Sequence, residues 1–195
     1  EVMKRGATKE EIIRTTQDLI TRNGIRAVRV DEIAQRLGIS KRTLYEMFAD
    51  KNDLISACLD DLARRQRQRI AASRRRRSGN PLQRTLRLAN DYIDSLYTVD
   101  HSFLADIRRK VLFAEQYDEH REFWRKELSL NLEECRGGGL LLSEIDTAAL
   151  AEQLMSTLFE LRLNRTTREE LYLLCRTILR GAATQQGIDL IDRKP

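Results

Sequence analysis

The sequence is poor in the residues that interrupt helices and in residues that build other fold classes. Its 195 residues include only 2 Pro and 9 Gly, and aromatic residues make up 6%. Chains so low in helix breakers are not loop-rich, and collagen-like and disordered classes are excluded on composition. No apolar run approaches the roughly 18 residues that cross a bilayer, so we expect no membrane segment.

The chain also has little cysteine. Cys58, Cys135 and Cys175 are odd in number, far apart, and without the spacing of a zinc site, which excludes a disulfide scaffold. We expect buried thiols in a reducing, cytoplasmic protein that needs no metal or other cofactor. No signal peptide is visible, and because the chain opens with Glu1 rather than Met, we expect the natural N-terminus to lie upstream.

Positive charge is unevenly distributed along the chain. The net charge is +5, with 28 Arg and 28 Leu but only 7 Lys. Residues 1–63 carry 11 basic and 11 acidic side chains, residues 64–79 carry 8 Arg and no acid, and residues 80–195 carry 16 basic and 19 acidic. A basic protein suggests a polyanionic partner, yet here one arginine tract, residues 64–79, accounts for the basicity.

Apolar spacing of three and four residues recurs along most of the chain, which predicts an all-α fold. Thr8 with Glu11 forms a capping box before the first helix, and Gly24 is expected as its left-handed C-cap. Arg74–Arg77 and the following Ser-Gly-Asn-Pro predict a linker. The expected helices cover residues 9–23, 30–37, 41–48, 51–69, 81–97, 103–113, 117–135, a segment capped by Asp146 or Ser143 and ending at 163, and a segment capped by Thr166 or Thr167 and ending at 186.

Two short helices separated by a tight turn carry the clearest functional signal. Gly38 permits the sharp bend, Ile39 plugs it, and Ser40 is a strong N-cap for the second helix. This is a helix-turn-helix pattern, whose second helix can enter the major groove of DNA. By itself the pattern also fits an ordinary turn at glycine in a helical protein.

The residues around this turn resemble the DNA-binding signature of the tetracycline-repressor (TetR) family. The resemblance is specific over residues 8 to about 62, and beyond them only the helix count and the last helix pair match. It implies a helix-turn-helix domain over 1–50 and a helical ligand-binding and dimerisation domain over 51–195, about nine helices in all, with a helix over 51–70 as the connecting lever. The matching positions are Ile33-Ala34, Gly38-Ile39-Ser40, Leu44-Tyr45, Phe48, Lys51 and Leu54.

The resemblance assigns the start of the second short helix to DNA. Lys41, Arg42 and Thr43 are candidates for base edges, since Arg pairs with guanine and Thr contacts the thymine methyl. Ser40 begins this exposed segment. The resemblance makes Tyr45 a phosphate contact, and Lys51 can meet a phosphate at a helix start. The family usually has Thr where Arg29 stands; Arg29 cannot cap the preceding helix but can reach phosphate, and Asp31 is expected to stabilise that helix end instead.

The C-terminal region is expected to supply a dimer interface and an effector pocket. The resemblance implies that the last two helices form a four-helix bundle with a second copy, and the dimer-interface candidates are Leu154, Leu158, Leu174, Ile178 and Ala182. Aromatic side chains on the middle helices can line a small-molecule pocket, although ordinary core packing is the alternative for each. The pocket candidates are Tyr92, Phe103, Ile107, Phe113, Tyr117, Phe123 and Trp124.

The leading hypothesis is therefore a ligand-responsive regulator, a repressor in most members of the family, that binds a palindromic operator as a homodimer. A ligand-independent architectural DNA-binding protein is the alternative. A small helical enzyme is the weakest reading, because no catalytic spacing supports it. For the arginine tract, a solvated, steering or structural role is favoured over direct phosphate binding or an acidic ligand.

Overall fold

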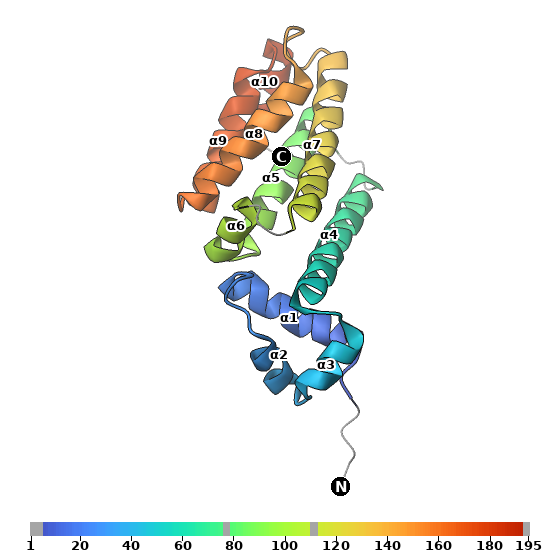
Figure 1. Cartoon of the computed structure of the whole chain (residues 1–195). Helices are drawn as coiled ribbons and strands as arrows, with labels where there is room; N and C mark the ends of the chain where they lie inside the picture. The colour runs from blue at the N-terminus through green and yellow to red at the C-terminus, as the bar shows by residue number, and fades with distance from the viewer. Residues whose placement is uncertain (1–5, 76–78, 110–112, 193–195) are drawn as a thin grey trace. The chain divides into compact units, whose positions relative to one another are not determined.

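The computed structural model describes residues 6–75, 79–109 and 113–192, and within them the chain is all α-helical (Figure 1). This confirms the predicted fold class, with ten helices in the described ranges rather than about nine. The helices are α1 (Lys9–Asn23), α2 (Val30–Leu37), α3 (Lys41–Met47), α4 (Lys51–Arg75), α5 (Pro81–Tyr97), α6 (His101–Arg108), α7 (Ala114–Gly137), α8 (Thr147–Leu163), α9 (Arg168–Gly181) and α10 (Gln185–Asp192).

The chain divides into two compact units by packing. Unit 1 comprises residues 1–68 and 99–117, and unit 2 comprises residues 69–98 and 118–195. Unit 1 thus combines the N-terminal helices with α6, which is distant in sequence. These packing units differ in kind from the functional domains expected over 1–50 and 51–195, whose boundary stays a prediction.

The first helix of unit 1 begins where its capping residues predict. The Glu11 amide donates to Thr8 Oγ1 at 3.1 Å, and the Thr8 amide donates to Glu11 Oε2 at 2.7 Å. This reciprocal pair satisfies amides that the helix itself cannot. The core of unit 1 is then assembled from apolar side chains of α1 to α4, which include Ile12, Leu19, Ile20, Ile33, Leu44, Phe48, Leu54 and Ile55.

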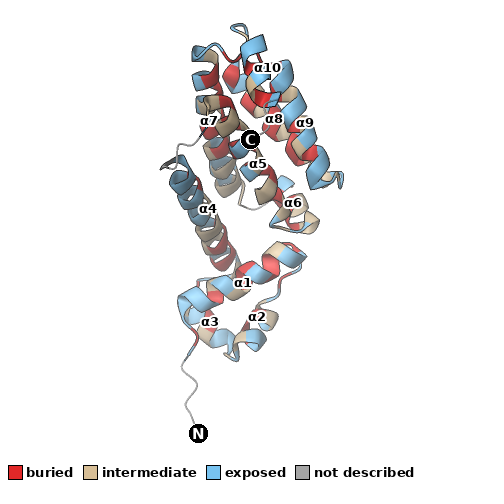
Figure 2. Ribbon diagram, turned by 180° about the vertical axis from the view of Figure 1, so that it is seen from behind, coloured by how far each residue is buried: buried red, intermediate tan, exposed pale blue. Residues whose placement is uncertain are grey.

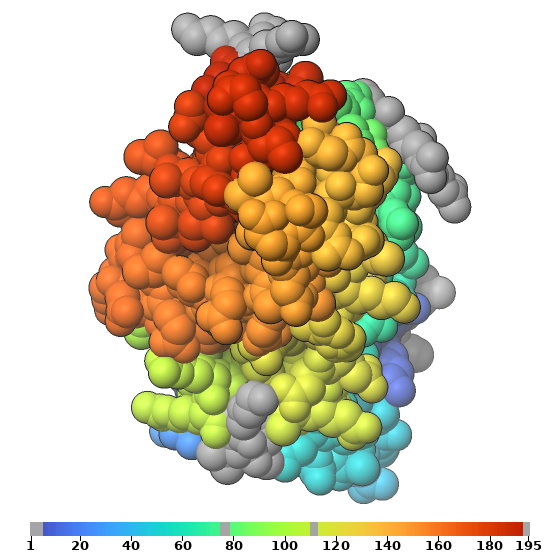
Figure 3. Space-filling model, turned by 90° about the horizontal axis from the view of Figure 1, so that it is seen from above, coloured from blue at the N-terminus to red at the C-terminus, as the bar shows by residue number. Residues whose placement is uncertain are grey.

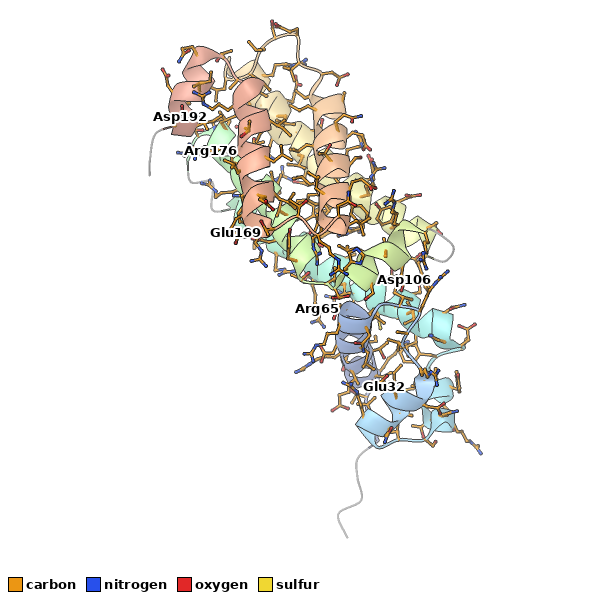
Figure 4. All side chains as sticks on the ribbon, turned by 90° about the vertical axis from the view of Figure 1, so that its left-hand side faces the viewer. Glu32, Arg65, Asp106, Glu169, Arg176 and Asp192 are labelled. Carbon is orange, nitrogen blue, oxygen red and sulfur yellow. The ribbon has the colours of Figure 1, made fainter. Side chains whose placement is uncertain are left out.

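Helix α6 packs against α1 and the loop that follows it. The Asp106 carboxylate, labelled in Figure 4, accepts a hydrogen bond from the Arg26 amide at 3.0 Å. Gly24 is the C-cap of α1 as predicted and has a positive φ of 85°, but its ψ of 162° lies outside the left-handed helical region. A Cβ there would lie 2.9 Å from Asp106 Oδ2. The expected helix over 103–113 is also shorter, since α6 ends at Arg108 and residues 110–112 lie outside the described ranges.

Unit 2 packs α5, α8, α9 and α10 against one another, and these helices have buried residues on one side and more exposed residues on the other (Figure 2). In the space-filling view of Figure 3, α9 and α10 lie side by side over one face of this unit. Asn80, rather than Pro81 alone, fixes the start of α5, because its side chain accepts from the Gln83 amide at 2.9 Å. The buried side chains include Leu82, Ala89, Ile93, Trp124, Leu128, Leu132, Leu154, Leu158, Leu171 and Leu179.

The expected single helix to residue 186 is interrupted, which produces the tenth helix. The Leu142 amide donates to the Ala182 carbonyl and the Thr184 amide to the Leu140 carbonyl, each at 3.0 Å. These bonds form an isolated antiparallel bridge that takes residues 182–184 out of the helical path. Gly187 then allows α10 to pass close to the Leu140 carbonyl, which a Cβ would overlap.

The fourth helix is longer than expected and includes two residues of the predicted linker. It continues to Arg75, because Ile70 is buried and the Arg74 guanidinium pairs with Glu127 at 3.1 Å. Arg76, Arg77 and Ser78 lie outside the described residues. Within the described ranges, no helix is both long and apolar enough to cross a bilayer.

All three cysteines lie in the helical core, as predicted. Burial, with a smaller contribution from Asp61, raises the pKa of Cys58 to about 12, and burial raises the pKa of Cys175 to about 12. Burial also raises the pKa of Cys135, against the opposing hydrogen bond with Thr85. A thiol with a raised pKa is a poor nucleophile at neutral pH, so these residues act as packing groups.

Candidate nucleic-acid interface

The turn between α2 and α3 has the geometry that its sequence predicts. Gly38 adopts the left-handed conformation at φ 64° and ψ 32°, and the Ile39 amide closes the turn on the Ala34 carbonyl at 3.0 Å. The Ser40 hydroxyl accepts from the Thr43 amide at 3.0 Å and starts α3. Local chemistry therefore sets where the second helix begins and where its first side chains point.

Helix α3 has one face in the core and one face in solvent. Leu44 is fully buried and Phe48 is 2% exposed, and the Lys9 ammonium lies 5.0 Å from the centre of the Phe48 ring. On the other face, Tyr45 is 45% exposed and the Arg42 side chain is 89% exposed. The buried pair fixes the orientation of the helix, so the exposed side chains are available to a partner.

The cations on this face already have carboxylate neighbours, which sequence reasoning did not identify. Lys41 Nζ lies 2.5 Å from the Asp31 carboxylate, and Arg42 Nε lies 3.2 Å from Glu46. All four side chains are more than half exposed, so each pair contributes little to stability. A phosphate or a base edge can therefore replace the carboxylates at small cost.

The two flanking candidates occupy the starts of helices. Arg29 is exposed and is the N-cap residue of α2, with extended backbone and no capping hydrogen bond from its side chain, as expected. Lys51 is the half-buried first residue of α4. The Asp53 amide beside it already donates to Asp50 Oδ1 at 2.8 Å, so a phosphate at Lys51 must rely on the ammonium more than on free amides.

The seven pocket candidates are divided between the units. Tyr92, Phe123 and Trp124 lie together in unit 2, where the Tyr92 and Trp124 rings pack edge to face at 5.3 Å and the Phe123 and Trp124 rings at 6.2 Å. The remaining four belong to unit 1, where Phe103 and Ile107 are buried and the other two are half-buried; these four are Phe103, Ile107, Phe113 and Tyr117. A common pocket for all seven stays a prediction.

Three of the five interface candidates are buried within unit 2, and the dimer interface itself stays a prediction. Leu154 is 2% exposed, Leu158 is fully buried and Ala182 is 7% exposed, so their side chains pack inside unit 2. Leu174 and Ile178 are half-buried on α9. The apolar stripe alone did not single out Leu173, which is 66% exposed on the same helix.

Part of the arginine tract is tied into structural contacts. Arg64 and Arg65 both pair with Asp61, Arg65 at 2.8 Å, and Gln17 donates to the same carboxylate at 2.9 Å. Partial burial raises the pKa of Asp61, but the Gln17 hydrogen bond and the two guanidiniums together lower it by more. The pKa of Asp61 therefore lies below its ordinary value. For Arg64 and Arg65 these contacts support the favoured structural role.

Comparison with known proteins isolates the same N-terminal segment. Residues 12–58 match the family model described as bacterial regulatory proteins, tetR family. Two uncharacterized HTH-type transcriptional regulators of Mycobacterium tuberculosis, from strains CDC 1551 / Oshkosh and ATCC 25618 / H37Rv, are each 43% identical over 51 residues. That match covers 26% of this chain and spans only 21% of each relative.

Solved structures match nearly the whole chain in fold. A transcriptional regulator from Saccharomonospora viridis, solved in complex with choline, superposes with a TM-score of 0.78 at 18% identity and covers 90% of this chain and 96% of its own. A TetR transcription regulator from Haloarcula marismortui gives 0.77 at 18% identity, covering 90% and 98%. Residues 12–58 are thus similar to the N-terminal segment of tetR-family regulators, and the solved structures show that the chain shares their overall fold.

Proposed function

We propose that this chain is a sequence-specific, DNA-binding transcriptional repressor that acts as a homodimer in the cytoplasm and responds to a small-molecule effector. It acts by binding rather than by catalysis and uses no cofactor. The observation that carries the proposal is the exposed face of α3, with Lys41, Arg42 and Tyr45, on a helix held by Leu44 and Phe48 within the matched segment.

The side chains on this face have the chemistry for reading a duplex. Arg42 can donate two parallel hydrogen bonds to guanine, and the half-buried Thr43 can meet a thymine methyl. Tyr45, Arg29 and Lys51 supply a hydroxyl and two cations for phosphates, which position the helix without reading sequence. Because residues 1–63 have no net charge, binding depends on where these groups lie more than on bulk attraction.

Dimerisation explains how so short a recognition helix can reach useful affinity. A two-fold dimer places two copies of α3 about 34 Å apart, one turn of DNA, and so requires an inverted repeat. Leu173 is exposed and Leu174 and Ile178 are half-buried on α9, so these apolar side chains are available to a second copy. The effector would bind the conformation with low DNA affinity more tightly and so shift the chain toward that conformation. The choline complex of the S. viridis regulator supports ligand binding by a protein of this fold.

The proposal is tested by selecting duplexes from a random DNA library with the purified chain. We expect an enriched inverted repeat with half-sites about 10 base pairs apart, bound roughly a thousandfold more tightly than a random duplex. Affinity should fall linearly with salt concentration on logarithmic axes. A scrambled duplex of equal composition is the control.

Two outcomes would overturn the proposal. Binding that is tight but equal for selected and scrambled duplexes would favour the architectural alternative. Absence of saturable binding to any duplex would remove the DNA-binding role altogether.

A further inference from the structure

One carboxylate in unit 2 is buried without full hydrogen bonding. Glu127, on α7, is 9% exposed. Its Oε1 pairs with Arg74 Nη1 at 3.1 Å, whereas its Oε2 is shielded from solvent and accepts no hydrogen bond from the described residues. Folded proteins satisfy nearly all buried polar atoms, so an orphaned carboxylate oxygen calls for a specific explanation.

The partner that Glu127 does have lies toward the surface. The Arg74 side chain is 56% exposed, compared with 11% for that of Glu127, so the guanidinium approaches from solvent and uses one oxygen only. The second oxygen retains its capacity for a donor or a cation. A partly paired buried carboxylate is costly, and a positively charged ligand would remove that cost.

A cluster of aromatic rings lies one helical turn before this carboxylate. Trp124 precedes Glu127 by three residues on α7, a spacing that places both side chains on one face of the helix. Tyr92 of α5 packs on Trp124 with ring centres 5.3 Å apart and planes at 67°, and Phe123 packs on it at 6.2 Å. Aromatic faces attract cations, most strongly when water is excluded, and Trp124 is 1% exposed.

We propose that unit 2 binds an organic cation, an amine or quaternary ammonium, through Glu127 and the Trp124–Tyr92 ring pair. The inference rests on the proposed function in one respect, because it names the chemical class of the effector. An anionic ligand is disfavoured by the carboxylate. A metal ion is disfavoured because the described residues hold no group of three or more His, Cys, Asp or Glu side chains arranged to bind one.

Trp124 makes the site directly measurable, since it is the one tryptophan among the 195 residues. The test is a titration of its fluorescence in the full chain, without DNA, with choline and with benzyltrimethylammonium. The neutral isostere 3,3-dimethylbutan-1-ol is the matched ligand control. We expect saturable emission changes with both cations and affinity for the neutral alcohol that is weaker by roughly tenfold or more.

Three variants separate recognition by Glu127 from a structural role. Glu127→Gln should weaken cation binding by about tenfold or more, while Glu134→Gln, an exposed carboxylate on the same helix paired with Arg84, should leave it unchanged. Arg74→Gln should tighten binding, because the carboxylate loses its competing cation. A purely structural Glu127 would not respond to Arg74→Gln in this direction, and circular dichroism checks that each variant is folded.

The proposal is overturned if neither cation changes Trp124 emission saturably up to millimolar concentration, or if wild type and a folded Glu127→Gln bind equally. Equal affinity for choline and its neutral isostere would also contradict it. Because no DNA is present in this titration, a negative result would not contradict the proposed DNA binding. A negative duplex selection would likewise not contradict cation binding by unit 2.

Discussion

The two units differ in how far apart in sequence their decisive contacts lie. In unit 1, the bounds of α1, α2 and α3 follow from residues a few positions away, namely Thr8 with Glu11, Gly38, and Ser40 with Thr43. In unit 2, the end of α9 depends on a bridge to residues 140–142, about 40 positions earlier. Local chemistry thus builds the candidate DNA-reading face, and long-range packing builds the candidate effector domain.

The largest expected effect tests which apolar residues of unit 2 belong to the chain's own core. Leu158→Ala should lower the free energy of unfolding by about 2–5 kcal/mol, because it leaves a cavity at a fully buried site. Leu173→Ala, at a site that is 66% exposed, should change it by roughly 0.5 kcal/mol or less in the monomer. Urea denaturation at low protein concentration measures both, and equal losses would contradict the assignment.

The next effect tests the long-range contact that separates α9 from α10. Gly187→Ala places a Cβ against the Leu140 carbonyl and should cost about 1–3 kcal/mol through forced backbone movement. Gly181→Ala is the matched control, because nothing lies within 4 Å of its added Cβ. The control should be neutral or stabilising in thermal melts, and a stable Gly187→Ala would mean that the close approach is not required.

A smaller effect tests the ion pairs on the candidate DNA-reading face of unit 1. Asp31→Asn removes the carboxylate 2.5 Å from Lys41 and one negative charge near the phosphates. DNA affinity should rise by roughly two- to tenfold at low salt, and the gain should shrink as salt screens it. Fluorescence anisotropy measures the change; a loss of affinity in a folded Asp31→Asn would show that Asp31 positions Lys41 instead of competing for it.

The smallest effect concerns Asp61 of α4, which bonds to Gln17 of α1 and pairs with Arg64 and Arg65. The pKa of Asp61 lies below the ordinary value of 3.8, so the ionised carboxylate stabilises the fold above pH 3.8. This contribution is lost as the pH falls through the lowered pKa. Asp61→Asn should therefore destabilise the chain by about 1 kcal/mol or less at pH 7 and converge with wild type in acid. Asp60→Asn, at an exposed neighbouring position, is the control. A difference in stability between wild type and Asp61→Asn that grows as the pH falls would contradict this prediction.

The same contrast explains what could be predicted from sequence. Caps and a glycine turn specify α1 to α3. Of the side chains expected to meet DNA, Thr43 and Lys51 are half-buried and the others are exposed, and their contacts with DNA stay a prediction. An apolar stripe cannot distinguish the chain's own core from a partner's surface, so a place for Leu154 and Leu158 at a dimer interface stays a prediction although both are buried in unit 2. The burial of Glu127 could not be predicted, because a glutamate in a helix rich in charged residues is expected to face solvent, and its contact with Arg74 joins residues 53 positions apart.

The central claim is that the exposed face of α3 reads DNA sequence. Arg42 and Arg36 form a matched pair, since each is an exposed arginine bonded to a glutamate four residues away, on α3 and α2 respectively. The decisive measurement is the affinity of wild type, Arg42→Ala and Arg36→Ala for the selected duplex and its scrambled control. The account predicts that Arg42→Ala loses about 1–3 kcal/mol of discrimination while Arg36→Ala keeps it. Equal discrimination by all three proteins would contradict it.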